Sequence, residues 1–206
     1  MPASSLTDCA AIVLAGGQSR RMGRPKAWLE FEGVPLLAHL VERLAGTFPR
    51  VVVVGAPGQP LPETAARRVD DERPGEGPLG GIVTGLRALG DEATFAFVCS
   101  CDAPFLAVDV AVYLAHVCRC YDVAVPRWEG RLHPLHAVYR VAVLPVLETL
   151  FAAGERRPVA LFDHVRTVIV PEQELHPLDP AGRTFWNMNT PDDYAAALAE
   201  WSRVRD

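Results

Sequence analysis

Short runs of consecutive apolar residues alternate with longer segments in which apolar positions recur every three or four residues. The uninterrupted runs are typical of strands buried on both faces, and the longer spacing is typical of amphipathic helices. The predicted strands are residues 10–15, 51–54, 95–100, 123–125, 134–139 and 167–170. The predicted helices are residues 36–44, 80–89, 108–119, 141–152 and 191–204. This alternation predicts an α/β fold, a Rossmann-like three-layer α/β/α sandwich around a mostly parallel sheet.

A proline- and glycine-rich stretch, residues 55–78, follows the second predicted strand and is expected to form a loop. Prolines elsewhere are scattered, and the chain contains neither an internal repeat nor a low-complexity segment. A chain of 206 residues, of which 50% are hydrophobic, is long and apolar enough to bury a sizeable core. We therefore expect one domain that spans residues 1–206.

Charge and cysteine usage exclude several classes of partner. The net charge is −5 and no basic block lies outside residues 20–26, which argues against a nucleic-acid surface. No apolar stretch is long enough to cross a bilayer, and residues 1–9 lack a secretory signal pattern. The five cysteines are an odd number, and their C-x-C spacing favours small buried hydrophobes, such as Cys99 and Cys101, over a metal site. These features predict a cytoplasmic protein.

The first predicted strand ends in a glycine pair followed by a basic loop. The segment Leu14-Ala15-Gly16-Gly17 offers backbone amides that no side chain shields, which is what close approach to an anion requires. The basic residues of the following loop are Arg20, Arg21, Arg24 and Lys26. The segment matches neither the Walker A nor the Rossmann glycine pattern, and a plain strand-to-helix turn is the alternative. The cluster of positive charge favours phosphate binding.

Two acids are candidates for the same site. Asp102 follows the strand predicted at 95–100, so its carboxylate is expected at the carboxyl edge of the sheet beside Gly16 and Gly17. An aspartate there suits Mg²⁺, which prefers one or two carboxylates together with phosphate oxygens, but it suits a helix N-cap equally well. Asp71 lies in the predicted loop, where a solvated loop acid is the simpler interpretation.

Polar residues near the carboxyl terminus and in the fifth predicted strand complete the set. Thr190 is expected to cap the last helix, which leaves Asn187 and Asn189 without a structural explanation. The two-residue periodicity of a strand predicts that His136 and His133 point to opposite faces. A structural or substrate-contacting role is expected for these histidines rather than that of a general base.

The glycine segment resembles a known signature. Leu14-Ala15-Gly16-Gly17-x-Ser19-x-Arg21-Met22-Gly23-x-x-Lys26 is similar to the signature of nucleotidyltransferases that act in sugar-nucleotide-type reactions, and most similar to molybdenum cofactor guanylyltransferases of the MobA type. The segments that extend the resemblance are 69–71, 77–81, 101–106, 133–139, 153–157 and 186–193. The resemblance therefore covers nearly the whole chain.

The resemblance implies a nucleotide-diphospho-sugar transferase fold and the transfer of GMP from GTP to the phosphate of molybdopterin-bound molybdenum, with release of pyrophosphate. It implies that Leu14, Ala15, Gly16, Gly17, Lys26, Asp71 and Asp102 bind the nucleotide, and that Asp102 holds Mg²⁺. Lys26 and Asp102 would be catalytic, and Asn187 and Asn189 would contact substrate. Charge and position alone place Arg20 and Arg21 on the pyrophosphate leaving group. Molybdoenzymes or chaperones would receive the product.

Two alternatives and two departures accompany the resemblance. Leu-Ala-Gly-Gly favours the guanylyl branch, because the related cytidylyltransferases tend to show Leu-Ala-Ala-Gly. A non-catalytic nucleotide-binding protein of the same fold is the other alternative, and the presence of both Lys26 and Asp102 argues against it. Pro25 stands where the family commonly has an acid, which predicts a stiffer loop. Gly55 stands where some members carry a nucleotide-binding asparagine, so that side-chain contact is not expected here, and backbone would replace it.

Overall fold

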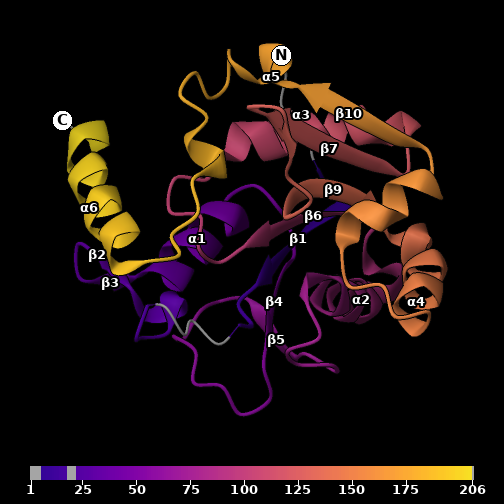
Figure 1. The fold of residues 1–206 in the computed structure, drawn as a ribbon, viewed down its shortest axis with the longest axis horizontal. Helices are drawn as coiled ribbons and strands as arrows, with labels where there is room; N and C mark the ends of the chain where they lie inside the picture. The colour runs from indigo at the N-terminus through magenta and orange to yellow at the C-terminus, as the bar shows by residue number, and fades with distance from the viewer. Residues whose placement is uncertain (1–5, 18–21, 206) are drawn as a thin grey trace.

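The computed structural model describes residues 6–17 and 22–205, and its centre is a mixed sheet (Figure 1). In spatial order the strands are β10 (Thr167–Pro171), β7 (Val123–Trp128), β9 (His136–Arg140), β6 (Phe95–Ser100), β1 (Cys9–Leu14), β4 (Val51–Gly55) and β5 (Arg67–Asp70), with β8 (Arg131–Leu132) paired to β7. Neighbouring strands are parallel except that β9 runs antiparallel to β6 and β7, and β8 runs antiparallel to β7. The predicted mostly parallel sheet is confirmed.

Helices cover both faces of this sheet, as predicted (Figure 1). One face carries α1 (Leu36–Ala45), α3 (Val108–Val117) and the short α5 (Glu172–Leu175). The other face carries α2 (Pro78–Leu89) and α4 (Leu144–Ala152). Successive residues of β1 alternate between the two cores, since Ala11 and Val13 belong to the first and Ile12 and Leu14 to the second. The central strand is therefore buried on both sides, which explains its unbroken apolar sequence.

The layer formed by α2 lies unusually close to β1. A Cβ atom at Gly85 would lie 2.7 Å from Cγ2 of Ile12, and one at Gly81 would lie 3.2 Å from Cδ2 of Leu14. Side chains at these helix positions would push the two elements apart. Their glycines thus let α2 pack directly against the strand that ends in the glycine pair.

A third, smaller core lies outside the two faces of the sheet. The carboxyl-terminal helix α6 (Pro191–Arg205) packs beside the hairpin of β2 (Glu30–Phe31) and β3 (Val34–Pro35) (Figure 1). The fully or largely buried members of this core are Met22, Leu29, Phe31, Leu36, Phe105, Met188 and Ala197. Residues from both ends of the chain therefore meet in one cluster.

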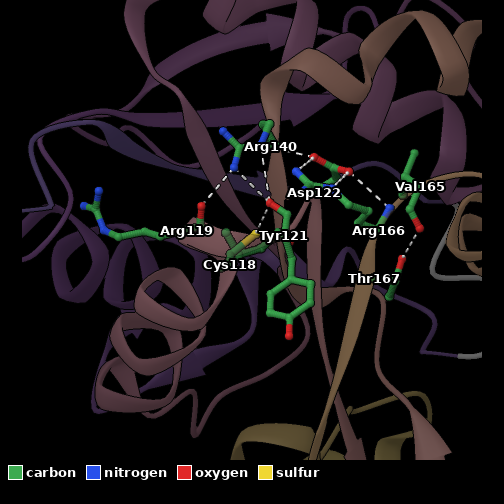
Figure 2. Close-up of polar contacts among 9 residues, drawn as sticks. Cys118, Arg119, Tyr121, Asp122, Arg140, Val165, Arg166 and Thr167 are labelled. Carbon is green, nitrogen blue, oxygen red and sulfur yellow. Dashed lines mark hydrogen bonds and ion pairs between the residues drawn. The ribbon is translucent and has the colours of Figure 1, made fainter.

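A polar network ties three strands together at the end of the sheet opposite the glycine pair (Figure 2). Asp122, just before β7, forms ion pairs with Arg140 at the end of β9 (3.3 Å) and with Arg166 just before β10 (3.2 Å). The Arg140 guanidinium also donates to the carbonyls of Arg119 and Tyr121, each over 3.1 Å. The guanidinium of Arg166 holds the pKa of the Asp122 carboxyl below its usual range.

Several sequence expectations are corrected. The predicted loop at 55–78 contains β5, an edge strand whose residues are mostly polar and exposed. Its lack of an apolar run removed the signal that identifies a strand. The strand predicted at 134–139 begins only at His136 and runs antiparallel to β6. Among residues 6–17 and 22–205, no helix combines the length and the apolar character that a membrane crossing requires.

Candidate active site

The carboxyl ends of β1, β4 and β6 meet at one edge of the sheet, beside a cavity of about 1130 Å³. The chain stays paired one residue beyond β1, because the Ala15 amide donates to the Val54 carbonyl over 2.8 Å. The lining residues include Leu14, Gly16, Gly17, Arg24, Pro25, Gln59, Asp71, Gly77, Pro78 and Ser100. The loops that follow these three strands therefore share one edge of the sheet, as predicted for the glycine pair and the segment that leads to Asp102.

The glycine pair forms an exposed part of this cavity wall. Gly16 and Gly17 are exposed, whereas Ala15 is buried and does not line the cavity. Gly17 has a φ angle of +136°, a conformation that residues with a Cβ atom rarely adopt. The backbone conformation at this position therefore favours glycine whether or not a ligand approaches it. Arg20 and Arg21, predicted to contact substrate, lie outside the described residues.

Lys26, Asp102 and Asn189 meet although they are far apart in the sequence. The Lys26 ammonium lies 2.7 Å from Oδ2 of Asp102 and donates to Oδ1 of Asn189 over 2.9 Å. The Ser100 hydroxyl donates to the other carboxylate oxygen of Asp102. The side chains of Lys26 and Asp102 are only 17% and 13% exposed, so this contact is partly shielded from water. Two oxygen atoms therefore converge on one cation beside the cavity.

Local structure holds each member of this group. Pro25 precedes the 3-10 turn η1 (Lys26–Trp28) with a φ angle of −63°, which its ring favours. The Met188 amide donates to the Asp102 carbonyl over 3.1 Å, which ties the segment before α6 to the end of β6.

The amino end of α6 fixes Asn189. The amides of Asn189 and Thr190 both donate to Oδ2 of Asp193 over 2.8 Å, and the Asp193 amide donates to Oγ1 of Thr190 over 3.2 Å. These hydrogen bonds, that of Asn189 first, hold the pKa of Asp193 below its usual range. The predicted Thr190 cap is confirmed. Asn187 is exposed, and no hydrogen bond among the described residues joins it to Lys26 or Asp102.

Asp71 lies on the cavity wall, and the interpretation as a solvated loop acid is wrong. Its side chain is buried, and the residue is 9% exposed. Oδ1 accepts hydrogen bonds from the Arg73 amide (3.0 Å) and from the Thr84 hydroxyl (3.3 Å). Asp71 therefore both stabilises the loop before α2 and lines the cavity. Its predicted contact with a nucleotide stays a prediction.

No sequence pattern points to Gln59, a cavity-lining residue inside the predicted loop. Its Nε2 donates to the Ala15 carbonyl over 3.1 Å, and its Oε1 accepts from the Ala56 amide over 2.9 Å. A Cβ atom at Gly55 would lie 2.8 Å from Cδ1 of Leu61 and 3.6 Å from Oε1 of Gln59. A side chain at position 55 would therefore compete with Leu61 and with the Gln59 amide for space.

The prediction that His133 and His136 point to opposite faces is wrong. Their rings lie 6.4 Å apart, and both pack against Phe185. The His136 amide donates to the His133 carbonyl over 3.0 Å, so a turn rather than a strand separates them. The pKa of His136 is lowered to about 4, chiefly by burial and to a smaller extent by the neighbouring His133, while Asp102 opposes the shift.

A second, smaller cavity of about 460 Å³ adjoins this histidine pair. It is lined by Trp128, His133, Phe185 and Trp186, and by the charged residues Glu129, Arg131, Arg183 and Glu200. Trp186 lies two residues before Met188, whose amide is bonded to the Asp102 carbonyl. The Lys26–Asp102 contact and this aromatic cavity are thus joined by one short segment.

Comparisons with known proteins agree with this geometry. A domain model described as a MobA-like NTP transferase domain matches residues 11–169. A relative from Mycobacterium tuberculosis (strain H37Rv) is 45% identical over 159 residues, 75% of this chain and 79% of the relative. A second, from Mycobacterium avium (strain 104), is 40% identical over 195 residues, 91% and 93% of the two chains. Each is named "probable molybdenum cofactor guanylyltransferase".

A solved structure gives the same result. The molybdopterin-guanine dinucleotide biosynthesis protein A of Archaeoglobus fulgidus has a TM-score of 0.79 and 25% sequence identity, covering 94% of this chain and 99% of its own. Fold, site and relatives agree on the class of protein, which is a nucleotidyltransferase. The chain belongs to the family of MobA-like NTP transferase domains.

Proposed function

We propose that the protein transfers GMP from GTP to the terminal phosphate of the molybdenum cofactor and releases pyrophosphate. The observation that carries this proposal is the convergence of Lys26, Asp102 and Asn189 beside a cavity that the glycine pair lines. The names of the mycobacterial relatives support the guanylyl group and this acceptor. Molybdoenzymes or their chaperones would then take up the product.

The geometry supports a mechanism of positioning and charge neutralisation. An oxygen of the acceptor phosphate attacks the α-phosphorus of GTP and forms the new P–O bond. The bond from that phosphorus to the bridging oxygen breaks, and pyrophosphate leaves with the electron pair. The amides of Gly16 and Gly17 and the ammonium of Lys26 would bind the triphosphate and neutralise its charge. A general base is not needed, since the attacking phosphate is already anionic near neutral pH.

The residues present fit a Mg²⁺ ion. Oδ2 of Asp102 and Oδ1 of Asn189 both lie within 2.9 Å of the Lys26 nitrogen, so two hard oxygen donors already face one positive charge. No group of three or more His, Cys, Asp or Glu residues capable of holding a metal occurs in the described part of the chain. Asp102 and Asn189 would therefore hold the ion together with phosphate oxygens. When bound, Mg²⁺ supplies positive charge to the phosphates.

We place the planar ring system of the acceptor in the second cavity. The aromatic side chains of His133, Phe185 and Trp186 line it, and Arg131 adds an exposed positive charge. Arg131→Ala is expected to raise the KM for the acceptor several-fold and to leave GTP binding unchanged. An unchanged KM for the acceptor would contradict this location of the acceptor.

Pyrophosphate release tests the proposal directly. We expect release with GTP, Mg²⁺ and the molybdenum cofactor, much slower release with CTP, and near-complete loss in Asp102→Asn. Asp163→Asn, an exposed aspartate in the 3-10 segment η5 (Pro158–Asp163), is the matched control and should keep full activity. A preference for CTP would assign the chain to the cytidylyl reaction instead. Nucleotide binding without release of pyrophosphate from either nucleotide would favour a non-catalytic binding protein.

A further inference from the structure

We propose that Gln59 is a positioning residue of the nucleotide site and acts by fixing the backbone of the glycine pair. This inference rests on the proposed function, because it concerns the site that would bind GTP. Gln59 belongs to residues 56–60, here called the clamp loop, which follow β4. It is half-buried and lines the larger cavity.

The clamp loop forms one hydrogen bond with the residue before the glycine pair and another with a residue just after Lys26. In the first, Nε2 of Gln59 donates to the Ala15 carbonyl over 3.1 Å. In the second, Nε1 of Trp28, two residues beyond Lys26, donates to the Pro60 carbonyl over 3.0 Å. Ala15 and Trp28, which lie on either side of the glycine pair and Lys26 in the sequence, are therefore each hydrogen-bonded to one short loop.

The contact at Ala15 determines how the first glycine presents its amide. The Ala15 carbonyl and the Gly16 N–H belong to one planar trans peptide, so they point in opposite directions. Fixing the carbonyl on Gln59 therefore fixes the direction of the Gly16 N–H. The Ala15 amide is held in turn by the Val54 carbonyl at 2.8 Å. Both peptide groups of Ala15 are thus oriented, although the next two residues are glycines, which impose little orientation of their own.

A glutamine suits this place because its amide offers a donor and an acceptor at once. Oε1 accepts from the Ala56 amide over 2.9 Å, which orients the side chain so that Nε2 faces Ala15. Residues 56–59 form a turn, in which the backbone amide of Gln59 donates to the Ala56 carbonyl over 3.0 Å. Because Gly55 has no side chain, the side-chain amide of Gln59 and the side chain of Leu61 can occupy the space beside it.

Two substitutions separate the contact to Ala15 from the other roles of Gln59. Gln59→Met keeps most of the bulk and removes both hydrogen bonds, without adding charge. Gln59→Glu keeps an acceptor for the Ala56 amide and removes the donor to Ala15. Gln173→Met, at an exposed position on α5, is the matched control.

The readouts are the hydrogen-exchange rates of the Gly16 and Gly17 amides and the GTP affinity from calorimetry. In both Gln59 variants we expect faster exchange at these amides and a GTP affinity weaker by roughly threefold to tenfold, the range of one lost hydrogen bond. The control should show neither change. We also expect a higher KM for GTP with less effect on kcat, because binding geometry is what Gln59 provides.

Amide exchange and GTP affinity that match wild type in Gln59→Met would overturn the inference. The inference would also be overturned if Gln59→Glu kept wild-type amide exchange and GTP affinity while Gln59→Met lost them. The contact with the Ala56 amide would then be the important one. Failure of the proposed function has a different result: the wild-type protein would not bind GTP. The amide exchange rates would still test the role of Gln59 in that case.

Discussion

At the scale of single residues, Lys26 is the position on which the candidate site depends most. It contacts both Asp102 and Asn189, and it is the only lysine in the sequence, where the other basic side chains are arginine. An ammonium is a compact charge that can move between partners, whereas a guanidinium prefers a fixed planar contact. Lys26 is therefore suited to leave Asp102 and meet a triphosphate.

This uniqueness makes a direct measurement possible. Reductive methylation with ¹³C-formaldehyde labels one side-chain amine, that of Lys26, besides the amino terminus. We expect the NMR resonance of the Lys26 methyl groups to move when GTP is added and when Asp102→Asn removes the neighbouring charge. A Lys26 resonance that stays in place at saturating GTP would show that the triphosphate does not reach this lysine.

His136 gives a second prediction at this scale. Its pKa is lowered by burial from 6.5 to about 4, so the unfolded chain binds the proton more readily between these values. The contribution of His136 to stability is complete above pH 6.5 and is lost as the pH falls toward 4, by about 3 kcal/mol in total. Urea unfolding of wild type and His136→Gln between pH 7 and 4 measures the difference. His164→Gln, at an exposed histidine, should leave the pH dependence as it is in wild type.

At the scale of elements, the network around Asp122 joins the strands in the half of the sheet that lies away from the larger cavity (Figure 2). Besides its two ion pairs, Oδ2 of Asp122 accepts from the Arg166 amide over 3.1 Å. Partly exposed ion pairs contribute little individually, and the hydrogen bond to the backbone adds to them. The network therefore holds the ends of β7, β9 and β10 together.

We expect Asp122→Ala to lower the free energy of unfolding by about 1–2 kcal/mol, mostly by loosening the edge strand β10. Chemical denaturation measures the total, and hydrogen exchange at the amides of residues 167–171 locates it. GTP binding should be unaffected, because the network lies at the other end of the strands from the glycine pair. Weakened GTP binding with unchanged stability would contradict this assignment.

The same scale shows what the sequence could and could not predict. Strands such as β1 and β6 are buried on both faces, so their apolar runs identify them without knowledge of the fold. β5 is a polar edge strand, which an apolar run does not mark. β9 is short and almost continuously buried, and such a run indicates neither where the strand begins nor whether it pairs in parallel or antiparallel. Asp102 was predictable because a strand end precedes it. Gln59 was not, because its role depends on the distant Ala15 carbonyl.

At the scale of the whole molecule, the candidate site depends on a part of the chain beyond the family domain model, which ends at residue 169. Asn189 comes from this later part, and so does α6, which packs on the small third core rather than on the sheet. Trp201 on α6 contacts Phe31 with ring centroids 4.8 Å apart and Phe105 at 5.9 Å. The position of Asn189 therefore depends on packing between the two ends of the chain.

Trp201 allows this dependence to be tested. Trp201→Ala should loosen α6 at a cost of about 3 kcal/mol, through the loss of a large packed side chain. We expect faster hydrogen exchange in residues 191–203 than in β1, and a larger loss of pyrophosphate release than of nucleotide binding, because the glycine pair keeps its place in the main sheet. Trp201→Phe is the control that keeps an aromatic ring. Its stability and activity should be close to those of the wild type. The indole N–H is buried with no hydrogen-bond partner among the described residues, so its removal leaves no group unpaired. Equal acceleration of exchange in α6 and in β1 would instead mean that the third core and the sheet unfold as one unit, and that Asn189 is held by the stability of the entire fold.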